Sequence, residues 1–128
     1  MKTKLLALLF LAVSLNSCTT DDSENLPITE ANLVGSWSLE SHTMNGKPMN
    51  NFKDRFTFTA DHKVTLIEAN YQSKCSGTYT LTGADLKCVF TIGEKFTYRL
   101  HIKSLTPDRL NWETKVAGEG MLNEIYRK

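Results

Sequence analysis

The chain has 128 residues, 41% of them hydrophobic, and a formal net charge of +1, so we expect a single globular domain. Its 15 Lys and Arg residues are scattered singly and are balanced by 14 Asp and Glu residues. This pattern argues against a nucleic-acid partner and against electrostatic attraction to an anionic surface.

Residues 1–17 have the parts of a secretory signal peptide: two early lysines, an apolar run from Leu5 to Val13 and small residues behind it. The apolar run is too short to span a bilayer, which takes about 20 residues. Its ending, Leu15-Asn16-Ser17-Cys18, resembles a bacterial lipobox. The resemblance implies cleavage after Ser17 and acylation of Cys18, by palmitate or a similar chain, which anchors the protein to a lipid bilayer. The alternative is a plain secreted protein with an incidental cysteine.

Residues 18–30 are expected to form a flexible tether behind the lipidated cysteine. The stretch after Cys18 is polar and acidic, and it holds nothing to bury. An acidic cluster at this place resembles the surface-export signal of some Gram-negative outer-membrane lipoproteins, although an ordinary solvated linker has the same composition. We therefore predict attachment to the outer membrane and leave open whether the protein faces the periplasm or the cell surface.

Residues 31–128 are expected to form an all-β domain. Apolar and polar residues alternate, and turn signals interrupt them about every eight to twelve residues. Because the links are short, neighbouring strands should be antiparallel, and pairing the first strand with the last removes both edges. The prediction is a small eight-stranded up-and-down barrel without a sizeable helix. Its strands are 33–43, 53–59, 63–69, 74–82, 86–92, 95–104, 109–116 and 120–127.

Two features of these strands bear on the interior. Gly77 falls on the inward face of its strand, which predicts a bend or a close approach of another backbone. The inward face of the last strand is ambiguous. The two choices are Met121, Asn123, Ile125 and Arg127, or Leu122, Glu124 and Tyr126.

The first strand carries Gly35-Ser36-Trp37. Two hairpin segments, 55–62 and 109–112, support the family resemblance to which this motif points. With this strand order, residues 31–128 resemble the lipocalin-like lipoproteins of Gram-negative outer membranes. The resemblance implies that Gly35 and Trp37 close one barrel end and that Arg127 packs over the indole, which requires the odd-numbered face of the last strand to point inward. It also implies a small hydrophobic ligand.

A barrel of eight strands is either filled by its own side chains or holds one small ligand. The aromatic residues that would line a cavity or fill the core are Trp37, Phe56, Phe58, Tyr79, Phe90, Phe96, Tyr98 and Trp112. Two functions remain open at this point. The protein binds a small hydrophobic ligand, or it is a solid barrel that docks onto another cell-envelope protein.

Cys75 and Cys88 remain as a pair once Cys18 is acylated. They lie on neighbouring strands in an oxidising compartment, and we hypothesise a disulfide between them. A tight two-residue loop would instead set Cys75 opposite Ile92, so the bridge needs a longer loop or a bulge near Gly77. Two buried free thiols are the alternative.

No catalytic motif is found in the sequence. His42, His62 and His101 are far apart without metal-ligand spacing, and we expect them at the surface or in loops. The glutamates alternate with apolar residues as solvated strand positions would. We therefore predict no enzyme activity, no cofactor and no metal site.

Overall fold

The computed structural model describes residues 24–49, 53–68, 73–92 and 94–128, apart from the side chains of Ile92 and Glu94. The predicted signal peptide and Cys18 lie outside these residues. Among the helices of the described part, none is long and apolar enough to cross a membrane. The elements are α2 (Glu30–Leu33), β1 (Gly35–Met44), β2 (Lys47–Pro48), β3 (Asp54–Phe58), β4 (Lys63–Glu68), β5 (Ser73–Thr82), β6 (Asp85–Ile92), β7 (Glu94–Leu105), β8 (Arg109–Val116) and β9 (Gly120–Arg127).

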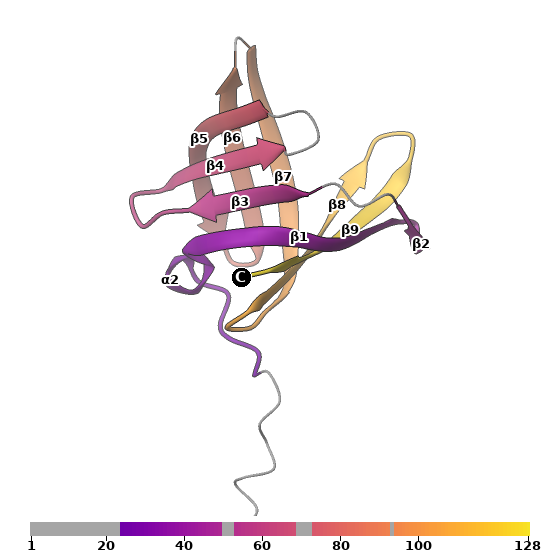
Figure 1. Cartoon of the computed structure of the whole chain (residues 1–128), viewed down its shortest axis with the longest axis horizontal. Coiled ribbons are helices and arrows are strands. Elements are labelled where there is room, and N and C mark those ends of the chain that lie inside the picture. Colours follow the sequence, from indigo (N-terminus) through magenta and orange to yellow (C-terminus); the bar gives the residue numbers. More distant parts are fainter. Residues whose placement is uncertain (1–23, 50–52, 69–72, 93) are drawn as a thin grey trace, which may run out of the picture.

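Eight strands form a closed antiparallel barrel, as the alternation predicted (Figure 1). Their order is β1-β3-β4-β5-β6-β7-β8-β9, and β9 pairs back onto β1 from Ser38↔Arg127 to Met44↔Leu122. β2 was not predicted, and it pairs with the end of β1. The other strands lie within two residues of their predicted bounds.

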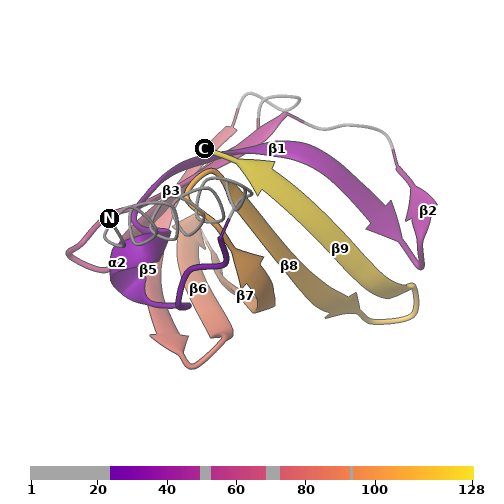
Figure 2. The ribbon, with the colours of Figure 1, turned by 90° about the horizontal axis from the view of Figure 1, so that it is seen from below.

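Two strands change partner part-way along, and this divides one end of the barrel into two lobes. β1 pairs with β3 as far as Ser38 and with β9 from there on. β7 pairs with β6 as far as His101 and with β8 from His101 on. The larger lobe is β3 to β6 with the first half of β7, and the smaller lobe is β8, β9 and the second half of β1. Figure 2 shows β8 and β9 leading away from β5 and β6.

Aromatic residues of the hydrophobic core connect the two lobes at the other end, where the lobes meet. Aromatic rings contact each other edge to face, with centroids 5.1 Å apart for Phe58 and Tyr79 and 5.0 Å apart for Phe56 and Trp112. The buried residues alternate along each strand with exposed ones, which is the pattern that the barrel was predicted from. They are Leu33, Trp37, Leu39, Phe56, Phe58, Val64, Leu66, Cys75, Tyr79, Leu86, Cys88, Phe90, Leu100, Ile102, Leu105, Leu110, Trp112 and Tyr126.

The chain enters the barrel through a short segment that packs against this closed end. The backbone N–H of Leu26 donates to the carbonyl of Leu105 at 2.7 Å, and Leu26 and Ile28 pack against the core. Helix α2 follows, with the Thr29 hydroxyl accepting from the N–H of Asn32 as an N-cap. The folded part therefore begins before residue 31, so residues 26–30 do not belong to the tether that was predicted over 18–30.

Trp37 is fully buried at the closed end, and its Nε1 donates to the carbonyl of Leu33 at 2.8 Å. Above its ring lies Lys128, with Nζ 4.9 Å from the centroid. Gly35 has φ +139°, and a Cβ at this position would lie 2.5 Å from Lys128 Cε. Gly35 thus leaves room for the lysine that covers the indole.

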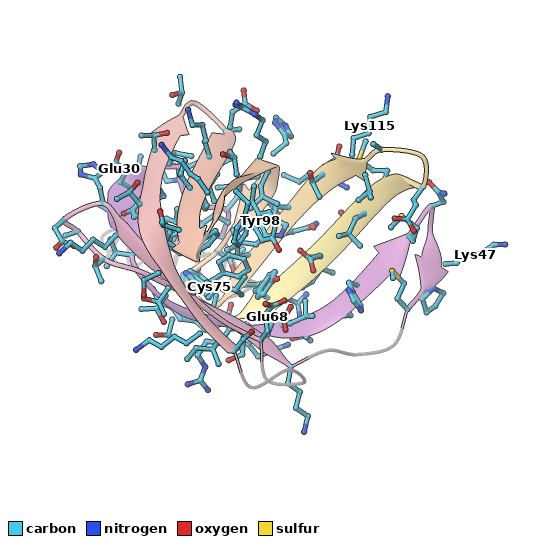
Figure 3. The ribbon with its side chains drawn as sticks, turned by 90° about the horizontal axis from the view of Figure 1, so that it is seen from above. Glu30, Lys47, Glu68, Cys75, Tyr98 and Lys115 are labelled. Atoms are coloured by element: carbon cyan, nitrogen blue, oxygen red, sulfur yellow. The ribbon has the colours of Figure 1, made fainter. Side chains whose placement is uncertain are left out.

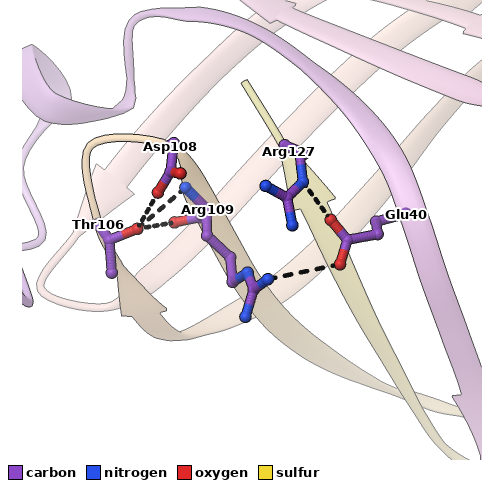
Figure 4. Close-up of polar contacts among 5 residues, drawn as sticks. All are labelled: Glu40, Thr106, Asp108, Arg109 and Arg127. Carbon is purple, nitrogen blue, oxygen red and sulfur yellow. Dashed lines mark hydrogen bonds and ion pairs between the residues drawn. The ribbon is translucent and has the colours of Figure 1, made fainter. Parts of the chain in front are cut away.

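The prediction that Arg127 packs over Trp37 is wrong. The even-numbered face of β9 points inward, with Tyr126 buried, so Arg127 is exposed on the outer face. Its Nε donates to Glu40, whose carboxylate also lies 3.5 Å from Arg109 Nη2 (Figure 4). The hydrogen bond from Arg127 lowers the pKa of Glu40, whose position coincides with a register shift between β1 and β9.

The turn before β8 supports this arrangement. Thr106 Oγ1 donates to Asp108 Oδ1 at 3.1 Å and accepts from the N–H of Arg109 at 3.0 Å (Figure 4). The carbonyl of Asp108 accepts from the N–H of Lys128 at 2.9 Å. These bonds fix the turn to the end of β9 and place Arg109 beside Glu40.

The disulfide hypothesis for Cys75 and Cys88 is not supported, because both are free, buried thiols. The β5–β6 hairpin has a two-residue loop and an unbroken register, in which Tyr79 pairs with Cys88. Cys75 is four residues further along β5, about 13 Å away at the usual rise of a strand. A disulfide requires α-carbons within about 7 Å. Burial raises the pKa of Cys88 to about 12, so it stays a thiol.

Candidate ligand-binding cleft

A cleft of about 670 Å³ lies between the two lobes at the end where they diverge. This volume falls within the range of small-molecule sites. Much of its wall is apolar: Met44, Met49, Phe56, Leu66, Leu100, Val116, Ala117 and Leu122. The barrel is therefore filled at one end and hollow at the other, so each of the two predicted interiors describes one part of it.

A buried polar group is built around Glu124 on one wall of the cleft. Glu124 pairs across the strands with His42 on β1 and with Trp112 on β8. Its Oε1 accepts from Trp112 Nε1 at 2.9 Å, and its Oε2 lies 3.7 Å from His42 Nδ1. Burial raises the pKa of Glu124, and the hydrogen bond from Trp112 and the neighbouring His42 oppose that shift.

Asp54 adds a second carboxyl at the start of β3. Its cross-strand partner is Glu68, so two acidic residues lie side by side. Burial, followed by the charges of Glu68 and Glu124, raises the pKa of Asp54 to about 6, while His42 acts in the opposite direction. Asp54 is thus poised to exchange a proton near neutral pH.

Two tyrosines complete the polar lining. Tyr98 lies between the lobes in Figure 3, with 37% of its surface exposed. Burial, with the negative charges of Glu68 and Asp54, raises the pKa of Tyr98 to about 12. Tyr126 is buried against Phe56, and burial likewise raises its pKa. Both phenols therefore remain hydrogen-bond donors at physiological pH.

Of the eight aromatic residues singled out from the sequence, Phe56 and Tyr98 line the cleft. Phe96 is partly buried against the core, and the other five are core residues. His62 and His101 are exposed as expected, but the surface prediction is wrong for His42, which is 6% exposed and lines the cleft. The sequence reasoning missed His42, Asp54, Glu124 and Tyr126 as site residues.

A second depression, of about 740 Å³, lies on the outer face of the barrel. It is lined largely by exposed polar side chains of β5 to β8, among them Thr80, Lys87 and His101. It shares Arg99, Leu100, Thr114 and Lys115 with the cleft, and Thr114 Oγ1 donates to the carbonyl of Arg99 at 2.7 Å. The wall between β7 and β8 is therefore thin at this point.

The polar groups of the cleft do not form a metal site. Among the described residues, no group of three or more His, Cys, Asp and Glu side chains is arranged to hold a metal ion. The arrangement instead offers a histidine, two phenols and the carboxyls of Asp54, Glu119 and Glu124 beside an apolar wall. It can bind a molecule that has an apolar body and a polar end.

The profile of the lipocalin-like domain family matches residues 33–112. The chain belongs to this family. A crystal structure of a lipocalin-like protein from Bacteroides uniformis is similar to this lipocalin-like domain, with a TM-score of 0.58 and 18% sequence identity. The alignment covers 76% of this chain and 98% of that one, and it shows a shared fold. No curated protein matches the chain significantly.

Proposed function

We propose that this lipocalin-like protein binds a small amphipathic molecule, with a hydrophobic body, in the cleft between its two lobes. The observation that carries this proposal is the cleft of about 670 Å³, whose apolar wall stays open beside a filled core. Met44 and Met49 lie at this opening, and their flexible side chains suit apolar surfaces of varied shape. The proposed role is binding rather than catalysis.

The test is uptake of N-phenyl-1-naphthylamine, a neutral probe that fluoresces when it enters an apolar site. The mature chain, with Cys18→Ser to prevent acylation, is expected to bind it saturably. Leu122→Trp fills the cleft and should weaken binding about tenfold, a loss of 1.4 kcal/mol. Met121→Trp is the matched control, because Met121 is 40% exposed on the outer face of the same strand.

Two results would contradict the proposal. One is the absence of saturable probe uptake by the parent chain, and the other is an equal loss of affinity in both tryptophan variants. A solid barrel that docks onto an envelope protein predicts the first of these results. Far-UV circular dichroism of each variant separates loss of the cleft from loss of the fold.

We also propose that acylated Cys18 holds the protein at the outer membrane. The lipobox resemblance of Leu15-Asn16-Ser17-Cys18 supports this location. Cells fed radiolabelled palmitate should label the wild-type protein, which should sediment with outer membranes. Cys18→Ala should abolish both label and sedimentation. Unchanged membrane association of that variant would sink the anchoring proposal.

A further inference from the structure

The polar side of the cleft shows which end group its ligand carries. Asp54 lies on the cleft wall, and within the described part of the chain no hydrogen bond reaches its carboxylate. Its strand neighbour is another acid, Glu68, whose Oε1 accepts from Ser73 at 3.1 Å. A half-buried carboxylate without a donor is unfavourable, because the protein does not replace the hydrogen bonds it made to water.

The groups that face Asp54 come from four strands. They are His42 on β1, Glu68 on β4, Tyr98 on β7, and Glu124 and Tyr126 on β9. Together with Asp54 they make six groups, of which three are carboxyls. His42 is the one base among the six. His42 is already placed beside Glu124. The basic residues Arg99 and Lys115 also line the cleft, but their side chains are exposed.

This charge distribution favours one end group over others. A carboxylate or phosphate near Asp54 would meet two further carboxyls, and the repulsion is strong where water is partly excluded. A hydroxyl could donate one hydrogen bond. A protonated primary amine offers three donors and a full positive charge, and charge-assisted hydrogen bonds are about twice as strong as neutral ones.

We infer that the ligand is an amphiphile whose apolar body contacts the Phe56 and Leu122 side of the cleft and whose protonated primary amine donates to Asp54 and Glu124. This inference rests on the proposed function, since it names the ligand class of the same cleft. Nothing covalent is involved, and the amine is held by hydrogen bonds and charge.

The same geometry makes binding depend on pH. Asp54 has a pKa of about 6, so it is mostly ionised at about pH 8 and mostly protonated at about pH 5. An alkylamine stays protonated throughout this range, because amines of the lysine type titrate near pH 10. The affinity for an amine should therefore fall as the pH falls through 6. Because the amine prefers the ionised carboxylate, its binding should also lower the pKa of Asp54.

The experiment compares three ligands of equal chain length, decylamine, 1-decanol and decanoate, each displacing N-phenyl-1-naphthylamine below its micellar concentration. At about pH 8, decylamine should bind about tenfold more tightly than decanoate, with 1-decanol between them. Asp54→Asn should reduce the preference for decylamine over decanoate to about threefold or less, since it removes one of the two carboxylates that would bind the amine. Asp85→Asn is the control, because Asp85 is 79% exposed outside the cleft.

The outcomes separate this inference from the proposed function. If decanoate binds as tightly as decylamine, or if Asp54→Asn leaves the preference for decylamine unchanged, the inference of an amine end group is wrong, while the proposal of a ligand cleft is unaffected. If none of the probes binds saturably, the proposal of a ligand cleft is itself wrong. If Asp54→Asn fails to fold by circular dichroism, Glu124→Gln decides, because its amide oxygen still accepts from Trp112 while its charge is gone.

Discussion

Replacing Trp37 with alanine is expected to lower the free energy of unfolding by about 3–5 kcal/mol. The indole is fully buried, and its removal leaves a cavity at the closed end of the barrel. It also leaves the carbonyl of Leu33 without its donor and removes the ring beneath Lys128. Domains of this size have total stabilities of about 5–15 kcal/mol, so the variant should be close to unfolding.

Denaturant unfolding followed by circular dichroism measures this loss. Trp37→Phe is the matched variant, because it keeps an aromatic ring in the core and loses the Nε1 hydrogen bond to Leu33. It should lose clearly less stability than the alanine variant. Equal and small losses, below about 1 kcal/mol in both variants, would show that the indole does not support the closed end.

Substituting alanine for Gly77 is expected to lower the free energy of unfolding by about 3 kcal/mol. A Cβ on Gly77 would point at the backbone of β6, 2.7 Å from the carbonyl carbon of Val89 and 2.9 Å from the α-carbon of Phe90. Neither is the end of a flexible side chain, so a whole strand would have to move. Glycine at this position allows the sheet to curve sharply between β5 and β6.

Ser76→Ala is the control for this substitution. Ser76 is exposed on the neighbouring position of β5, so it introduces the same residue in the same strand without a clash. Its free energy of unfolding should stay within about 0.5 kcal/mol of the parent. If Gly77→Ala were as stable as Ser76→Ala, the close approach of β6 would be absent in solution.

The barrel itself could be predicted because each strand repeats a simple two-residue pattern. In β7, Leu100 and Ile102 are buried while His101 and Lys103 are exposed. The two-residue loop between β5 and β6 likewise predicted the register that separates Cys75 from Cys88. Because register follows from local turn geometry, it decided against the disulfide that the expected oxidising compartment had suggested.

The cleft could not be predicted, because it depends on where β1 and β7 change partners. The register shift between Leu39 and Ser41 has no glycine or proline to mark it. In β9, both faces mix apolar and polar residues, and the pairing of Tyr126 with the buried Leu39 and Leu110 places the even face inward. Glu124 then enters the interior, where Trp112 and His42 stabilise it.

The short elements at the barrel ends also lay beyond the sequence pattern. Helix α2 is one turn long, too short for a periodic apolar face, and it is stabilised by its cap and by Trp37. Lys128 lies over the indole because β9 ends with its even face inward, which moves Arg127 outward. These contacts depend on tertiary packing, and the resemblance named the wrong basic residue for this reason.

The most direct test of a ligand cleft between the lobes is a map of amide chemical-shift changes while decylamine is titrated into the isotope-labelled mature chain with Cys18→Ser. We predict saturable changes at His42, Asp54, Tyr98 and Glu124, around the cleft. Changes confined to the outer face, at Thr80 and Lys87, or no saturable change at all, would contradict the account.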